Sequence, residues 1–283
     1  CGCEIRWLHL KDENGFSLES AREELYAMLC DGSGDASKID SVPTLSSKHE
    51  NVWEKILILG NPNNPTGRAI SATELERLAE VCRETHTWLM LDECFQWFLD
   101  TRRECSFVGN LLNGVGDHVI LLNALTKICS MAGLRLGYGI IPNAGLRERL
   151  EKFRQPWSVS APAQAGGVAA FAVLADHSEG NPLEWTVKSL QTERPQLAEK
   201  LEELGFIVYP SQTNYLLFRS PDEDSRDYKQ GCLEHGILIR ACENFEGLNR
   251  HYYRVAVRNR GENERLINIL KEVQSEEKHN VNL

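Results

Sequence analysis

Short apolar runs alternate with helix-like stretches along the first half of the chain. The runs cover residues 55–59, 87–91, 118–122 and 136–141, and helical patterns cover 71–85 and 145–153. Apolar runs of this length, separated by helical stretches, are typical of strands in a parallel sheet that has helices on both faces. The alternation therefore predicts an α/β fold, which is the strongest constraint that the sequence supplies.

A polar residue follows each of three apolar runs. Asn64 comes after the run at 55–59, Asp92 directly follows 87–91, and Lys127 comes shortly after 118–122. In an open α/β sheet, ligands bind outside the carboxyl ends of the strands. Taken singly, Asn64 is an ordinary turn residue, Asp92 a helix N-cap and Lys127 a surface lysine. Their coincidence at three strand ends favours a ligand site.

The side chains suit the chemistry of pyridoxal phosphate. A lysine that is partly desolvated at a strand end is a usable nucleophile for an aldehyde, so Lys127 is the candidate Schiff-base residue. A carboxylate such as Asp92 keeps a pyridine nitrogen protonated, which makes the ring an electron sink. The Asn64 amide can donate to a phenolate oxygen. Arg135, eight residues beyond the lysine, can bind an anion such as the cofactor phosphate.

Several segments resemble a known family. The segments NPNNPTG (61–67), LMLDE (89–93), LTK (125–127) and AGLRLGYG (132–139) are similar to the fold type I pyridoxal-phosphate enzymes of the aminotransferase class I/II family. The resemblance extends over essentially the whole chain. It implies a mainly parallel central sheet with a smaller C-terminal α+β domain, and a homodimer. It also implies that Thr126 contacts the cofactor phosphate and that Phe95 stands where relatives often have a tyrosine.

Three longer stretches narrow the resemblance. Residues 125–140, 154–166 and 240–266 are most similar to the threonine-phosphate decarboxylases of cobalamin synthesis. This implies decarboxylation of L-threonine O-3-phosphate to (R)-1-amino-2-propanol O-phosphate. Histidinol-phosphate aminotransferases share most of the motifs, so transamination is the first alternative. A catalytically inert fragment or partner-binding module that keeps the fold is the second.

Two arginines of the second half are candidates for binding substrate. Arg254 lies inside a strand-like stretch (252–257), and Arg240 ends the run 237–239. A strand arginine must be solvated, paired or bound to a ligand, and a planar guanidinium binds carboxylate or phosphate bidentately. By resemblance, Arg254 falls where the family holds the substrate carboxylate, and Arg240 where phosphosubstrate members hold the phosphate. The alternative is an exposed face with ion pairs to Glu243 or Glu262.

The expected organisation has a large cofactor-binding domain (1–155), a connecting helix (156–181) and a small C-terminal domain (182–283). Residues 31–51 form a polar loop, 4–10 a first strand and 17–28 a helix. The C-terminal domain is expected to hold helices at 183–204, 226–235 and 263–273, a strand pair within 206–218, and strands at 236–240 and 252–257. The chain begins at Cys1 without Met, and family members have a further N-terminal part that supplies a glycine-rich phosphate loop. We therefore expect the N-terminal part of the fold to be missing.

Charge and cysteine content limit the partners. The net charge of −10 argues against nucleic acid, which needs a basic face. No apolar run approaches the roughly 20 residues of a membrane span. The nine cysteines show no pattern of metal ligands, so we expect free thiols, no metal and a cytoplasmic location. The expected partner is a phosphorylated amino acid.

Overall fold

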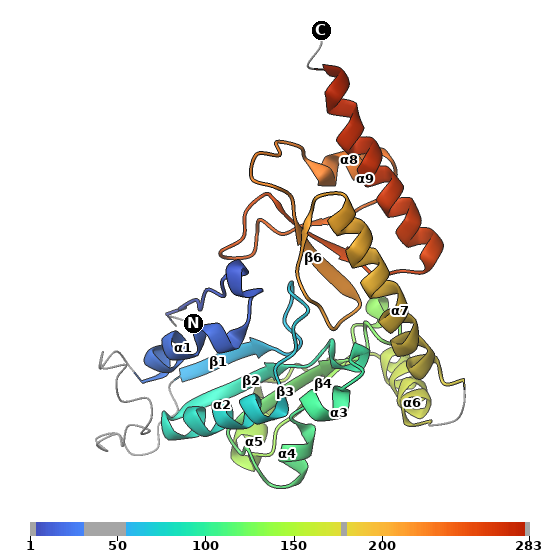
Figure 1. Ribbon diagram of the computed structural model, residues 1–283. Helices are drawn as coiled ribbons and strands as arrows, with labels where there is room; N and C mark the ends of the chain where they lie inside the picture. The colour runs from blue at the N-terminus through green and yellow to red at the C-terminus, as the bar shows by residue number, and fades with distance from the viewer. Residues whose placement is uncertain (1–3, 31–54, 177–179, 281–283) are drawn as a thin grey trace. The chain divides into compact units, whose positions relative to one another are not determined.

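The structure is a computed structural model that describes residues 4–30, 55–176 and 180–280 (Figure 1). The chain forms two compact units. We call residues 17–63 and 69–185 the parallel-sheet unit, and residues 1–16, 64–68 and 186–283 the antiparallel-sheet unit. The division expected at 155 and 182 stays a prediction. The grouping of residues 64–68 with the C-terminal part is not indicated by any sequence pattern.

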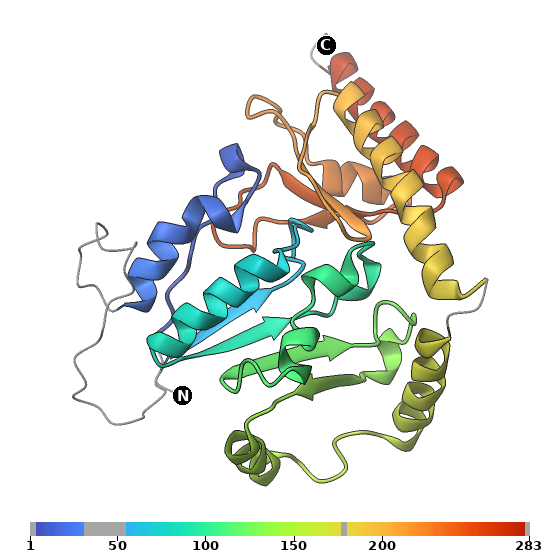
Figure 2. The ribbon, with the colours of Figure 1, turned by 60° about the horizontal axis from the view of Figure 1, so that its bottom comes forward.

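The parallel-sheet unit contains a four-stranded sheet in the order β1-β2-β3-β4. The first three strands are parallel and β4 is antiparallel to β3, so the expected mainly parallel sheet is confirmed (Figure 2). Gly60 pairs with Asp92, and Asp92 pairs with Leu122, so the first three strands end at one edge. The strands are β1 (Lys55–Gly60), β2 (Thr87–Asp92), β3 (Val119–Ala124) and β4 (Gly137–Ile140).

Helix α2 (Ala72–Glu84) shows how the local sequence forms these elements. Its buried apolar residues follow helical spacing, and they are Leu75, Leu78, Ala79 and Cys82. The Ser71 hydroxyl accepts the backbone N–H of Glu74 at 3.3 Å, which caps the helix. The Glu74 carboxylate accepts two hydrogen bonds at 2.9 Å from Arg22 of helix α1 (Arg22–Leu29). It therefore does not complete a capping box.

The antiparallel-sheet unit has the strand order β5-β6-β8-β7. Aromatic side chains pack against both faces of this sheet. One group comprises Phe206, Phe218, Tyr228 and Tyr253. The other comprises Phe16, Tyr209, Leu217, Cys242 and Tyr252, with the N-terminal segment packed into it. The strands are β5 (Ile207–Val208), β6 (Tyr215–Arg219), β7 (Arg240–Ala241) and β8 (Tyr252–Ala256).

The helices expected from periodicity are present, and most of their ends shift by one or two residues. The helix expected at 263–273 extends to Asn280, and the connecting helix expected over 156–181 covers only 161–175. Two short α-helices and one 3-10 helix between β2 and β3 were not expected. Ser17, which the sequence offers as the cap of the helix at 17–28, makes no side-chain capping bond. The α-helices besides α2 are α1 (Arg22–Leu29), α3 (Arg102–Cys105), α4 (Val108–Leu112), α5 (Ala144–Phe153), α6 (Ala161–Ala175), α7 (Pro182–Glu203), α8 (Tyr228–Glu234) and α9 (Arg260–Asn280). The 3-10 helices are η1 (Asp12–Asn14), η2 (Leu18–Ala21), η4 (Gln96–Phe98) and η5 (Ala132–Leu134).

Two predicted strands are wrong, and the polar loop at 31–51 lies outside the described residues. Residues 4–10 have no strand structure, and Ile5 and Trp7 are exposed, because alternation alone cannot make a strand that has no pairing partner. Residues 236–239 are a turn and an unpaired segment. Arg240 therefore begins β7, where it was expected to end a strand.

Candidate active-site residues

Asp92 is the last residue of β2, at the edge where the parallel strands end. Its side chain is exposed, and its Oδ1 accepts the backbone N–H of Cys94 at 2.9 Å. The Asn61 N–H donates to the Asp92 carbonyl at 2.9 Å. Among the residues that the structure describes, no cation pairs with the Asp92 carboxylate. Asp92 is therefore held in place and still able to pair with a positive ligand group.

Lys127 lies three residues beyond β3, in a turn closed by the bond from the Ser130 N–H to the Lys127 carbonyl at 3.1 Å. Its Nζ donates to the Thr126 hydroxyl at 3.1 Å and lies 5.5 Å from the centre of the Phe95 ring. The expected desolvation of the lysine is wrong, since its side chain is exposed in this structure. The turn ends on the surface, where a strand-end lysine keeps access to water.

Cys94 links the electrostatics of Asp92 and Lys127. Burial is the main cause that raises the pKa of the Cys94 thiol to about 12, and the bond to Asp92 and its charge add to the rise. The Lys127 charge opposes the rise. We refer to Asp92, Phe95, Thr126 and Lys127 as the strand-end cluster. It brings together four of the residues predicted from sequence.

Arg135 lies in the loop that joins β3 to β4. Ala124 and Gly137 are paired across these strands, so Thr126 and Arg135 each lie two residues beyond the same pair. Arg135 adopts the left-handed conformation (φ 53°), and its Nη1 donates to the Ala132 carbonyl at 3.1 Å. The guanidinium is exposed and keeps further N–H donors for an anion.

Arg240 and Arg254 are directly opposite each other in the β7–β8 pair. Arg254 lies 5.0 Å from the centre of the Tyr215 ring, and Arg240 donates to the Asn244 side chain at 3.0 Å. Within the described ranges neither arginine pairs with a carboxylate, whereas Arg258 binds Glu262 at 2.6 Å. Like charges opposite each other destabilise a sheet. The arginine pair, as we call Arg240 and Arg254, is therefore suited to an anionic ligand.

Asn64 belongs to the antiparallel-sheet unit, where its Oδ1 accepts a hydrogen bond from Arg254. Its loop is anchored through Gly67, whose carbonyl accepts the Gln212 N–H at 2.8 Å. Gly67 has φ +75°, and a Cβ there would come within 2.1 Å of the Ser211 hydroxyl. The close packing fixes the loop, and with it Asn64, beside Arg254.

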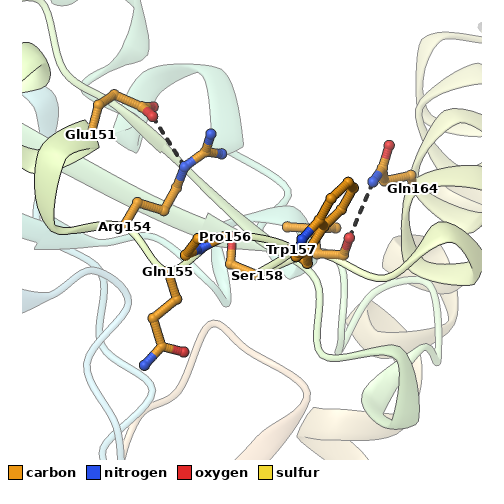
Figure 3. Close-up of a pocket in the computed structure, with 8 residues that line it drawn as sticks. Glu151, Arg154, Gln155, Pro156, Trp157, Ser158 and Gln164 are labelled. Carbon is orange, nitrogen blue, oxygen red and sulfur yellow. Dashed lines mark hydrogen bonds and ion pairs between the residues drawn. The ribbon is translucent and has the colours of Figure 1, made fainter.

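A hollow of about 280 Å³ lies in the parallel-sheet unit around Trp157 (Figure 3). It is lined by residues 154–159 with Glu151 and Gln164, and none of the strand-end residues lines it. The Arg154 guanidinium contacts Glu151 at 3.0 Å, and the Trp157 side chain is 97% exposed. The hollow is therefore not a site formed by the strand-end residues.

Comparison with known proteins assigns the family. A profile described as aminotransferase class I and II matches residues 26–270. The chain belongs to the aminotransferase class I and II family. The members of this family use pyridoxal phosphate, and the mixed, mainly parallel sheet with its helices is their fold.

Individual relatives include both kinds of enzyme expected from the sequence. The chain is 34% identical to threonine-phosphate decarboxylase of Salmonella typhimurium, over 96% of this chain and 65% of the relative. It matches the histidinol-phosphate aminotransferase of Clostridium acetobutylicum with a TM-score of 0.70 at 29% identity, covering 85% and 66% of the two chains. For L-threonine-O-3-phosphate decarboxylase of Porphyromonas gingivalis the TM-score is 0.68 at 25% identity, with 81% and 68% covered. The chain thus spans just under two thirds of the Salmonella enzyme's length.

Several polar residues around the strand ends were not predicted from sequence. Asn61 and Glu93 are both completely buried and bond to the segment 105–107. The signal for Glu93 was its place directly after Asp92, where the alternation of a strand turns the next side chain to the opposite face. No group of three or more potential metal ligands occurs among the residues described. In the same residues no helix is long and apolar enough to cross a membrane.

Proposed function

We propose that the chain belongs to a pyridoxal-phosphate enzyme that decarboxylates L-threonine O-3-phosphate, giving (R)-1-amino-2-propanol O-phosphate for cobalamin synthesis. The observation that supports a phosphorylated substrate is the arginine pair. The two cations lie opposite each other, and neither pairs with a carboxylate among the residues that the structure describes. The 34% identity to the Salmonella threonine-phosphate decarboxylase favours decarboxylation. The Clostridium histidinol-phosphate aminotransferase supports transamination as the second candidate.

The strand-end cluster fits the cofactor by the chemistry of its groups. Asp92 offers an exposed carboxylate without a described cation partner, and it would hold the ring nitrogen. Lys127 offers an exposed amine that donates a hydrogen bond to the Thr126 hydroxyl, and it would bind the cofactor at its aldehyde carbon. Thr126 and Arg135 would hold the phosphate, and Phe95 would lie against the lysine side chain. When bound, pyridoxal phosphate supplies an electron sink for the bonds at the substrate Cα.

The residues of the chain would then act by position and charge. Arg254 would hold the substrate carboxylate and Arg240 its phosphate, each through a planar fork of N–H donors. Asn64, bonded to Arg254, would donate its amide N–H to the phenolate oxygen. Lys127, once free of the cofactor, would carry the proton to or from Cα. Decarboxylation or transamination depends on which bond at Cα these contacts orient for cleavage.

We also propose a homodimer in the cytoplasm. Apolar side chains are exposed on α5, α6 and the segment between them, including Phe153 (84%), Trp157 (97%) and Val168 (74%). Exposed apolar patches of this kind favour a protein partner, and an obligate dimer buries more than about 2,000 Å². The seven cysteines within the described ranges are free thiols, which suits a reducing compartment. Sedimentation as a monomer at micromolar concentration would contradict the dimer.

The product distinguishes the two reactions. We expect release of CO2 from threonine phosphate with no 2-oxo acid present. An aminotransferase would instead stop after one half-reaction unless 2-oxoglutarate were added. Formation of glutamate from histidinol phosphate and 2-oxoglutarate at an equal or greater rate would favour the aminotransferase. An absence of both activities, with no absorbance change on adding pyridoxal phosphate, would favour a non-catalytic chain.

A further inference from the structure

Glu93 is a buried carboxylate beside Asp92 that the proposed reaction does not use. It is 0% exposed, its Oε2 accepts the Ser106 hydroxyl at 2.7 Å, and its Oε1 accepts the Phe107 N–H at 2.8 Å. Among the residues that the structure describes, no lysine, arginine or histidine forms an ion pair with it. A buried carboxylate with no cation partner is costly to ionise. Its burial directly after Asp92 in the chain therefore suggests that it has a role there.

The bonds of Glu93 hold the frame in which Asp92 sits. The Glu93 N–H donates to the Leu122 carbonyl at 2.8 Å, and its carbonyl accepts the Gln96 N–H at 2.9 Å. These bonds fix the turn that supplies the Cys94 N–H to the Asp92 carboxylate. The turn is thus tied both to β3 and to the segment that contains Ser106.

A second buried side chain, that of the residue directly after β1, holds the same segment. Asn61 is 0% exposed, and its Nδ2 donates to the Cys105 carbonyl at 2.8 Å. Its Oδ1 accepts the Ile70 N–H at 2.8 Å, and its own N–H donates to the Asp92 carbonyl at 2.9 Å. Asn61 and Glu93 therefore both hold segment 105–107, and both are tied to Asp92, Asn61 by a hydrogen bond and Glu93 by the chain.

The protonation of Glu93 depends on the charge of Asp92. Burial is the main cause that raises the pKa of Glu93 to about 7, the bonds from Phe107 and Ser106 oppose the rise, and the Asp92 charge adds to it. The pKa of the Tyr138 phenol of β4 is raised mainly by burial, and the Glu93 charge adds a smaller contribution. A cation bound to Asp92 would offset the Asp92 charge and favour the ionised form of Glu93.

We propose that Glu93 is a positioning residue for Asp92: its buried carboxylate fixes the turn after β2, and its negative charge strengthens the hold of Asp92 on a cationic ring nitrogen. The second part rests on the proposed function, because it assumes that a protonated pyridine binds at Asp92. The first part concerns the protein without cofactor. The two parts predict separate measurements.

The first experiment uses the cofactor-free chain. Thermal unfolding is followed between pH 5 and 8 for the wild type, Glu93→Gln, Asp92→Asn and the double variant. The pKa of Glu93 in the folded chain is raised above its ordinary value, so its protonated form stabilises the fold and that stability is lost as the pH rises towards about 7. We expect the wild-type midpoint to fall with pH relative to that of Glu93→Gln. In the Asp92→Asn background this fall should move to lower pH.

The second experiment measures the affinity for pyridoxal phosphate at pH 6 and pH 8. Glu93→Gln should bind nearly as tightly as the wild type at pH 6 and roughly three- to tenfold more weakly at pH 8, the scale of one partly screened charge interaction. Ser106→Ala removes one donor to Glu93 and should weaken binding less. Asp224→Asn is the matched control, because Asp224 is a nearly buried carboxylate of the other unit that bonds Tyr228 and Arg226. It should not change the affinity.

The outcomes separate the two ideas. The role of Glu93 would be overturned if Glu93→Gln lost the same affinity for pyridoxal phosphate at both pH values. It would also be overturned if Asp92→Asn left unchanged the pH range in which the unfolding midpoint falls. A wild-type chain that binds no pyridoxal phosphate would overturn the proposed function and the second part of the role. The unfolding cycle would still decide whether Glu93 and Asp92 are coupled.

Discussion

The strand-end cluster and the arginine pair are built on different kinds of sheet. Asp92 and Lys127 follow parallel strands, whose carboxyl ends meet at one edge whatever the details of the loops. Arg240 and Arg254 instead meet across an antiparallel pair whose β7 strand has two residues. The first arrangement follows from topology, and the second from a register that a shift of one residue would destroy. We therefore expect the two regions to respond differently to substitution.

The largest effect should come from Lys127→Ala. Because the side chain is exposed, its loss should leave the fold intact and abolish activity, by at least the roughly 10²–10⁴-fold of a general acid/base. Borohydride reduction with pyridoxal phosphate, followed by peptide mapping, should label Lys127 in the wild type. Labels spread evenly over several lysines would remove the strand-end cluster as the cofactor site.

Arg254→Ala tests the arginine pair. Loss of a bidentate charged contact should lower kcat/KM, and the corresponding loss of transition-state stabilisation should be about 2–5 kcal/mol. Arg254→Lys should recover only part of this loss, because lysine lacks the planar fork. Arg240→Ala should show a similar defect that shrinks with substrates lacking the phosphate. Equal activity of Arg254→Ala and wild type would exclude the arginine pair from the substrate site.

Gly67→Ala tests whether the anchored loop holds Asn64 beside Arg254. The new Cβ would meet Ser211 at a backbone φ of +75°, so we expect a destabilisation of about 1–3 kcal/mol. Gly114→Ala is the matched control, since Gly114 has φ +77° with nothing within 4 Å. Gly114→Ala should lower the free energy of unfolding by only about 1 kcal/mol, the cost of placing an alanine at a positive φ. Equal losses in denaturant unfolding would mean that the contact with Ser211 contributes nothing.

Asp12 tests the attachment of the N-terminal segment to the antiparallel sheet. Its Oδ2 accepts from Tyr252 at 2.8 Å, from Tyr209 at 3.3 Å and from Arg219 at 3.2 Å. The Tyr252 bond is the main cause that lowers the Asp12 pKa, so this stability is present at neutral pH and is lost as pH falls through the lowered value. Asp12→Asn should cost about 1 kcal/mol at pH 7, because a partly exposed group is screened.

That cost should shrink in acid, where the wild-type carboxyl is also protonated. Asp222→Asn is the control for Asp12, since Asp222 also approaches Arg219, at 3.7 Å, but its side chain is 69% exposed. We expect almost no change in its unfolding midpoint. A loss for Asp12→Asn that is the same at pH 3 and pH 7 would show that packing and not ionisation matters there.

The smallest effect should come from Arg258→Ala, four positions from Arg254. Arg258 forms an exposed i,i+4 ion pair with Glu262, which is worth about 0.3–0.5 kcal/mol. Activity should be unchanged, in contrast to Arg254→Ala. A substantial loss of kcat/KM would extend the anion site beyond the arginine pair.

The sequence by itself determined that the sheet is mainly parallel and which segments form its strands. Apolar runs and helical spacing report burial, which is a local property of each segment, so β1, β2 and β3 and helix α2 were predicted close to their observed ends. Asp92 and Lys127 were predicted because parallel strands place their carboxyl ends together. The motifs of the family were also visible without any structure.

Tertiary structure alone decided the pairings between distant segments. No local pattern shows that residues 4–10 lack a strand partner, that Arg240 begins a strand opposite Arg254, or that the Asn64 loop packs on Ser211. The burial of Glu93 against Ser106 likewise depends on where the chain returns after β2. These contacts join residues whose separation in the chain carries no periodic signal, and their geometry is set by packing.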